Sequence, residues 1–234
     1  MRRLIFLLFI AALPGLVPAR ELVVNQKNTK ASDTNDGTPE KPLKTISGAA
    51  TRVRSGDKVV VHAGQYRETV IINASGTADA PIIFEAAPGE TAVIKGSEII
   101  KHWMRDTGEI WKAKLPPLPV RSNQSNDPTF WRTNDVHMVI VKDGEQLDAW
   151  HLRRVTTRDQ LQPGSFFCDV PSNLLFVWLT DSSNPNDATI EVALRGAWLW
   201  VFGNNIIIRG LQMRHSSTRG IVDWPACVLI QPLL

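Results

Sequence analysis

Short runs rich in valine and isoleucine recur at nearly constant spacing between residues 57 and 100, and this regularity restricts the fold more than any other feature. Gly, Pro, Asn or Asp residues separate the runs, as is typical of turns between strands. The steps between runs are 11, 12 and 10 residues, which suits a solenoid whose rungs stack in register, although a sandwich of short strands has similar spacing. The runs are residues 59–61, 70–72, 82–84 and 92–94.

One helical pattern precedes these strands. Pro42 is suited to the first turn of a helix and Gly56 to the position after its end. The first coil of a solenoid has an open apolar end and an unpaired edge, which an amphipathic helix can cover. We therefore expect residues 42–54 to form a cap. Its apolar face consists of Leu43, Ile46, Ala49, Ala50 and Val53.

The composition changes after residue 100, since all eight tryptophans lie between Trp103 and Trp224. Asp143-Gly144 is a hairpin turn signal, and a second hairpin is expected within residues 166–179. From residue 204 the earlier pattern of buried strands returns. We interpret residues 103–195 as an inserted antiparallel β subdomain and residues 196–234 as the resumed solenoid.

The N-terminus has the features of an export signal. Arg2 and Arg3 precede an apolar stretch, and residues 17–19 form a small-residue cleavage site, so the mature chain is expected to begin at Arg20. The stretch is shorter than the roughly 20 residues that a membrane-spanning helix needs, and an uncleaved anchor is the alternative. Residues 1–19 are thus a predicted signal peptide and residues 20–102 the cap and first coils. The signal peptide predicts that the protein is secreted, or that it lies in the periplasm or at the cell surface.

The charge of the mature chain is nearly balanced. Of 26 Lys and Arg residues, 24 remain without Arg2 and Arg3, against 23 Asp and Glu residues. A nucleic-acid binder would concentrate a basic excess, so we expect no nucleic-acid partner. No later segment resembles a membrane span, so no membrane partner is expected after cleavage, and we expect a monomer.

Two cysteines, Cys168 and Cys227, each lie in an apolar run. An oxidising compartment would let them pair, but a chain of this length can bury a core without a disulfide. Small buried thiols are the alternative interpretation. No Cys-x-x-Cys or His-rich spacing accompanies them, so they predict no metal site.

Eight segments contain recognisable motifs in a fixed order, namely 35–46 (NDGTPEKPLKTI), 56–59 (GDKV), 64–68 (GQYRE), 75–82 (SGTADAPI), 88–90 (PGE), 94–97 (IKGS), 162–167 (QPGSFF) and 207–211 (IIRGL). The first three resemble the opening of secreted right-handed parallel β-helix proteins of the pectin-lyase-like superfamily. The next three resemble the following coil in proteins of the chondroitinase-B and alginate-lyase type. The last two are similar to an inserted hairpin unit and the returning strand of related β-helix proteins, some of which are glycoside hydrolases.

The resemblance implies an all-β fold, namely a right-handed parallel β-helix with a helical cap and an inserted antiparallel β subdomain. It also implies a polysaccharide substrate, and a lyase acting on acidic polysaccharide is the first expectation. A glycoside hydrolase and a non-catalytic carbohydrate-binding or surface module are the alternatives, because a fold does not fix a reaction. The catalytic residues of those lyases lie on middle coils downstream of this sequence, so the catalytic residues are unknown. No metal or other cofactor is expected here, and the resemblance leaves room for calcium in a longer parent protein.

Candidate substrate-binding residues follow the returning strand. Arg214, His215 and Arg219 lie where the concave face of a solenoid could meet an anionic sugar, with solvated turn residues as the alternative. Trp224 could stack on a sugar ring. Trp198 and Trp200 could do the same, but their alternation with apolar neighbours favours core packing at the junction with the insert.

Other polar residues give weaker signals. Asp223 is the only acidic residue after Glu191, whereas a glycosidase needs two carboxyl groups. The loop of residues 32–37 has oxygen atoms that could bind calcium but lacks the spacing of a known calcium loop, so turn chemistry is the preferred explanation.

The last residues of the chain, 228–234, are mostly apolar. A solenoid needs about three repeats and a cap at each end, and only one cap is evident. We therefore expect the sequence to be the front part of a longer protein that has been cut short.

Overall fold

The computed structural model describes residues 18–116, 136, 138–142, 151–217 and 228–230. Almost all of the predicted signal peptide lies outside these residues. In the described part of the chain, no helix is long and apolar enough to cross a membrane.

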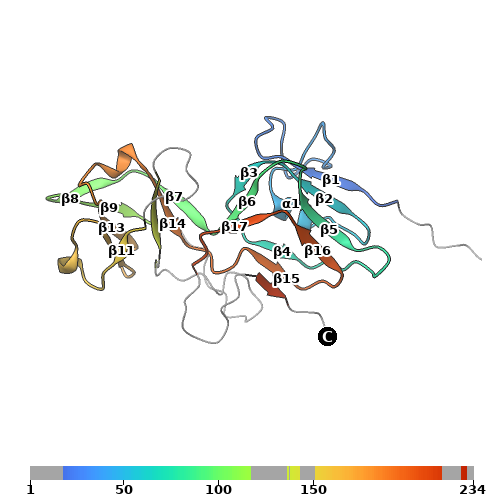
Figure 1. The fold of residues 1–234 in the computed structure, drawn as a ribbon. Coiled ribbons are helices and arrows are strands. Elements are labelled where there is room, and N and C mark those ends of the chain that lie inside the picture. The colour runs from blue at the N-terminus through green and yellow to red at the C-terminus, as the bar shows by residue number, and fades with distance from the viewer. Residues whose placement is uncertain (1–17, 117–135, 137, 143–150, 218–227, 231–234) are drawn as a thin grey trace, which may run out of the picture.

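Three parallel sheets wind around one apolar core and form a right-handed parallel β-helix, as the sequence predicts (Figure 1). Sheet 1 contains β1 (Glu21–Val24), β2 (Lys58–Val61), β5 (Ile82–Ala86) and β16 (Ile206–Arg209). Sheet 2 contains β3 (Gly64–Tyr66), β6 (Ala92–Lys95) and β17 (Gln212–Arg214). Sheet 3 contains β4 (Val70–Ile72), β15 (Leu199–Val201) and β18 (Val228–Ile230).

The repeating runs are the sides of coils, and this corrects the expectation that they are successive rungs. Residues 59–61 lie in sheet 1, but the next run, 70–72, lies in sheet 3. The partner of Val59 on the next coil is Phe84, so one full coil spans two runs and includes the short strand β3. The apolar runs locate β2, β4, β5 and β6, whereas only the pairing shows which strands stack.

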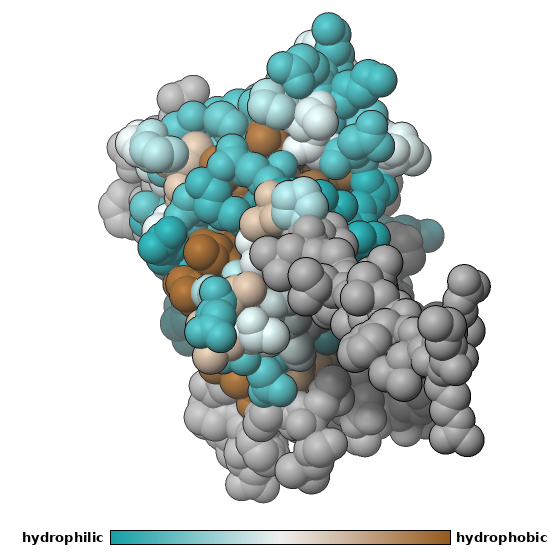
Figure 2. Space-filling model, turned by 90° about the vertical axis from the view of Figure 1, so that its right-hand side faces the viewer, coloured by the Kyte–Doolittle hydropathy of each residue, from teal (hydrophilic) through white to brown (hydrophobic). Residues whose placement is uncertain are grey.

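Strand register divides each sheet into an inner and an outer face. Leu22, Val59 and Phe84 are in register across sheet 1, and all three are buried in the core. On the outer face, the Lys58 ammonium pairs with carboxylates of the neighbouring strands, Glu21 at 2.8 Å and Glu85 at 3.3 Å. Figure 2 shows one side of the molecule, whose described surface is mostly hydrophilic with small apolar patches.

Helix α1 (Ile46–Ala50) packs into the core beside β1 and β4, the front strands of sheets 1 and 3, so the predicted cap is confirmed in position. It is shorter than the predicted range of 42–54. Leu43 instead forms a bridge with Val24 and belongs to the first coil. The helix starts after Thr45, whose hydroxyl accepts a hydrogen bond from the Gly48 N–H, because this cap satisfies a backbone donor of the first turn.

An antiparallel part with its own core comes between β6 and β15 in the chain (Figure 1). The hairpin expected within residues 166–179 is confirmed by the pairing of β12 with β13, while the turn signal Asp143-Gly144 lies outside the described residues. The domain ranges predicted from the sequence, 1–19, 20–102, 103–195 and 196–234, stay predictions. Sheet 4 contains β10 (Val139–Lys142), β14 (Thr189–Ala193) and β7 (Ser97–Ile100). Sheet 5 contains β11 (Arg153–Arg154), β12 (Ser165–Asp169), β13 (Leu174–Trp178), β9 (Ile110–Lys114) and β8 (Met104–Thr107).

Asp57 connects the start of β1 with the turn before β2. Its buried carboxylate accepts hydrogen bonds from the Arg20 N–H at 3.0 Å, the Arg20 guanidinium at 2.6 Å and the Arg54 N–H at 2.9 Å. Burial alone would raise the pKa of Asp57, but the hydrogen bonds and the charge of Arg20 outweigh it, so the pKa lies below its ordinary value.

A depressed pKa predicts an acid-dependent contribution of Asp57 to stability. The contribution is fully present above the unfolded-state pKa of about 3.9 and is lost as the pH falls through the lower folded-state pKa. We expect Asp57→Asn to lower the free energy of unfolding near neutral pH and to flatten its decline in acid, as measured by urea unfolding between pH 2 and 7. Asp36→Asn, at an exposed position, is the control, and an unchanged acid limb in Asp57→Asn contradicts the prediction.

Candidate functional site

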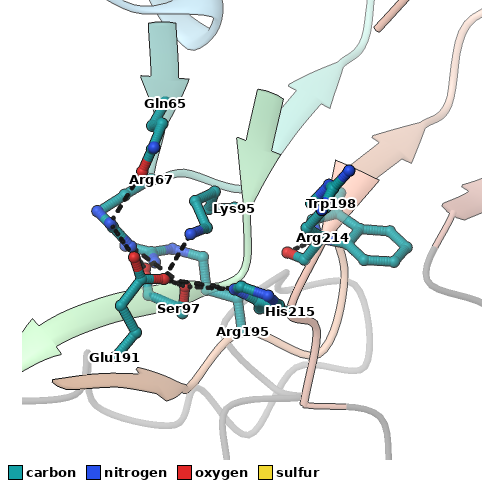
Figure 3. A network of polar contacts seen from close by, with 9 residues as sticks. All are labelled: Gln65, Arg67, Lys95, Ser97, Glu191, Arg195, Trp198, Arg214 and His215. Carbon is teal, nitrogen blue, oxygen red and sulfur yellow. Dashed lines mark hydrogen bonds and ion pairs between the residues drawn. The ribbon is translucent and has the colours of Figure 1, made fainter. Parts of the chain in front are cut away.

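A buried carboxylate joins the insert to the β-helix. Glu191 lies on β14 and is 1 % exposed (Figure 3). Its Oε2 atom is 2.6 Å from Nζ of Lys95, which lies on β6 and is 0 % exposed, and its Oε1 atom is 2.8 Å from a guanidinium nitrogen of Arg67. Arg67 follows β3, one coil before β6. One side chain of the insert therefore binds cations from two consecutive coils.

Two further polar side chains complete this cluster. The Ser97 hydroxyl donates to Oε2 of Glu191 at 2.6 Å, and Nδ1 of His215 lies 3.3 Å from the same oxygen (Figure 3). The Arg67 guanidinium also donates to the backbone oxygen of Ser97 at 2.9 Å. We call Arg67, Lys95, Ser97, Glu191 and His215 the junction cluster.

The backbone holds His215 in place. Its φ is 58°, in the left-handed region that residues other than glycine rarely adopt. Gly96 lies directly against it, and a Cβ at that position would overlap the His215 carbonyl oxygen. The Gly96 N–H donates to the backbone oxygen of Arg214 at 3.0 Å. A side chain at position 96 would therefore force the backbone at His215 to move.

The junction cluster contains Ser, His and Glu, but its geometry is not that of a nucleophilic triad. In a triad, one imidazole nitrogen contacts the nucleophile and the other contacts the acid. Here Nδ1 of His215 is the atom near both Ser97 and Glu191, and the Ser97 hydroxyl bonds directly to the carboxylate. The arrangement therefore positions the insert and compensates buried charge.

Two of the four predicted substrate-binding residues, Arg214 and His215, lie in the described part of the chain. Arg214 lies on β17 and is partly exposed, with its guanidinium donating to Oε1 of Gln212 at 3.3 Å. His215 is buried in the junction cluster. Arg219 and Trp224 lie outside the described residues, so sugar binding by these four residues stays a prediction.

The remaining candidates take up packing and turn positions. Trp200 is buried and stacks on Phe202 with 5.6 Å between ring centroids, and the half-buried Trp198 donates to the backbone oxygen of Arg214 at 2.8 Å. Cys168 is buried in the core of the insert, whereas Asp223 and Cys227 lie outside the described residues. The Asp33 carboxylate accepts hydrogen bonds from the backbone N–H groups of Lys44 and Thr45, so it connects this loop to the start of α1.

Sequence reasoning missed Arg67, Lys95 and Glu191. Arg67 and Glu191 are 124 positions apart, so no local spacing connects them. Lys95 ends an apolar strand, and a single charge there also fits a solvated strand end. The available signal was weak: an acidic residue within the apolar run of β14, residues 189–193.

The parallel sheets, the core and the insert define a pectin-lyase-like right-handed β-helix fold. No family model matches the chain. Among known proteins it is similar to the pectate lyase PEL9 of Emericella nidulans, with 25 % identity over 230 residues that cover 96 % of this chain and 54 % of that protein. An uncharacterized protein of Bacillus subtilis, YwoF, is 38 % identical over 68 residues, which are 29 % of this chain and 14 % of YwoF.

Two solved structures have the same fold. The complex of XylC with xylose superimposes with a TM-score of 0.66 and 24 % identity, over 85 % of this chain and 36 % of XylC. A glycoside hydrolase superimposes with a TM-score of 0.55 and 16 % identity, over 85 % of this chain and 51 % of that protein. The chain thus resembles carbohydrate-active proteins and spans about half or less of the length of each.

Removing the charge of Glu191 tests the junction cluster. We expect Glu191→Gln to lower the free energy of unfolding by about 3–5 kcal/mol, because it leaves Lys95 buried without a full counter-charge. Urea unfolding measures the loss, and Glu191→Gln combined with Lys95→Met should recover part of it. The control is Glu85→Gln, which breaks surface pairs with Lys58 and Arg209 and should cost about 0–1 kcal/mol. Equal losses in the two single variants would show that the junction cluster contributes nothing special.

Proposed function

We propose that this chain forms the first coils of a secreted carbohydrate-active protein, and that the complete parent is a lyase acting on acidic polysaccharide. The observation that carries the proposal is the similarity to a pectate lyase along 96 % of the chain, through both the coils and the insert. The fold supports a polymeric substrate, because a solenoid offers an extended face of stacked strands.

Arg214 is the residue of the described chain that we assign to sugar binding. A lyase acting on a uronic acid needs a cation to neutralise the sugar carboxylate, and a guanidinium binds carboxylates with two parallel hydrogen bonds. Arg214 is partly exposed on β17, and His215 behind it is fixed to Glu191. Arg219 and Trp224 are proposed as further contacts from the sequence alone. The base and the proton donor are assigned to the longer parent, as is any calcium.

The test uses the full-length protein that carries this sequence at its N-terminus. Incubation with polygalacturonate should produce the ultraviolet absorbance of unsaturated sugar ends. The absorbance should appear both with added calcium and with a chelator, and the chelator should not increase it. New reducing ends without absorbance would indicate a glycoside hydrolase instead. Binding without any product would indicate a non-catalytic module, and either result would reject the lyase.

Secretion is a separate part of the proposal. We expect the exported protein to be a monomer that begins at Arg20, which N-terminal sequencing and size-exclusion chromatography measure. A mature protein that still begins at Met1 would contradict cleavage and favour the membrane-anchored alternative.

A further inference from the structure

The first residue of the predicted mature chain is bound by a buried carboxylate. The backbone nitrogen of Arg20 donates to Oδ1 of Asp57 at 3.0 Å, and the Arg20 guanidinium donates to Oδ2 at 2.6 Å. Asp57 is 2 % exposed, whereas Pro18 and Ala19, the two residues before Arg20, are exposed. The chain therefore passes from solvent into the fold at the bond where cleavage is expected.

Further contacts fix Arg20 on the first coil. Its guanidinium also donates to the backbone oxygen of Arg52, shortly after α1, at 2.9 Å. Its backbone oxygen accepts the Lys58 N–H at the start of β2 at 2.9 Å. The Arg54 N–H holds the Asp57 carboxylate from the other side at 2.9 Å. The place of the Arg20 nitrogen is thus set by contacts with residues 52–58, not by the residues that precede it in the chain.

Cleavage after Ala19 changes the chemistry of this nitrogen. A peptide N–H is one uncharged donor, whereas a free α-amino group is mostly a charged ammonium with three N–H donors near neutral pH. Hydrogen bonds between charged groups are shorter and stronger than those of a neutral donor. One proton of the ammonium can keep the bond to Asp57, and the loss of the exposed residues 18 and 19 leaves the other two protons to water.

The charges around the nitrogen are compatible with an added cation. Within the described part of the chain, Asp57 forms one ion pair, with the partly exposed Arg20 guanidinium. Lys58, the next residue, pairs instead with Glu21 at 2.8 Å and Glu85 at 3.3 Å. Water screens the repulsion between the Arg20 guanidinium and an ammonium on the same residue, because both groups reach the surface. The buried carboxylate can therefore bind both.

We propose that Asp57 binds the α-ammonium group of Arg20 that signal cleavage creates, and that this ion pair fastens β1 to the first coil of the exported protein. The inference rests on the cleavage in the proposed function but not on any reaction of the parent protein. β1 is the end strand of sheet 1 and pairs with β2 (Figure 1). A stronger contact at its N-terminal end opposes fraying, so processing stabilises the strand that starts the β-helix.

Hydrogen exchange measured by mass spectrometry tests the proposal on two defined forms of the full-length protein. One form begins at Arg20. The other begins at Pro18, so it keeps a peptide N–H at Arg20 and has its ammonium two residues away. We expect the peptide that covers β1 to exchange about five- to ten-fold more slowly in the form that begins at Arg20, in line with the difference between charged and neutral hydrogen bonds. Asp57→Asn should remove this difference.

Glu21→Gln is the matched control, because it removes an exposed carboxylate next to Arg20 in the chain and should leave the difference unchanged. Equal exchange in the two unsubstituted forms would overturn the proposal, and this comparison needs no variant to fold. A difference that persists in Asp57→Asn, or that Glu21→Gln also removes, would overturn it as well.

N-terminal sequencing of the exported protein separates this inference from the proposed cleavage. A start at a residue other than Arg20 would reject the cleavage and, with it, this role of Asp57. A start at Arg20 together with equal exchange in the two forms would reject the role of Asp57 alone.

Discussion

The register of the parallel strands is the constraint on which the rest of the structure depends. Because parallel neighbours align residue by residue, a side chain that points inward on one coil must stack on an inward side chain of the next. Leu22, Val59 and Phe84 satisfy this rule in sheet 1, and Tyr66, Ile94 and Met213 satisfy it in sheet 2. The same rule stacks the outward side chains, so charges of neighbouring coils also meet. Alternating signs in sheet 1 make such contacts favourable, whereas Arg67 and Lys95 bring two cations together beside sheet 2, and these require a counter-charge.

The insert supplies that counter-charge. It leaves the β-helix after β6, directly beyond Lys95, and β14 brings Glu191 back to the same place. Burying a lysine without a carboxylate would cost several kcal/mol, so the buried position of Lys95 depends on the insert that brings Glu191 to it. Gly96 permits the close approach of the returning coil at His215. The cluster therefore explains how a large insertion can interrupt one coil without breaking the stacking on either side.

The sequence predicted local features better than their assembly. Turn residues and β-branched runs located β2, β4, β5 and β6, and the pattern within residues 166–179 located a hairpin, because these signals act over a few residues. The predicted length of a coil was wrong because β3 was not recognised. This strand contains only three residues, one of them Gly64, and has no apolar run of its own. The helix was predicted too long, because Leu43 has the same apolar character in a strand bridge as in a helix. The sequence pointed to His215 by its place near the returning strand, but its partner Glu191 comes from the insert, and no local pattern could connect the two residues.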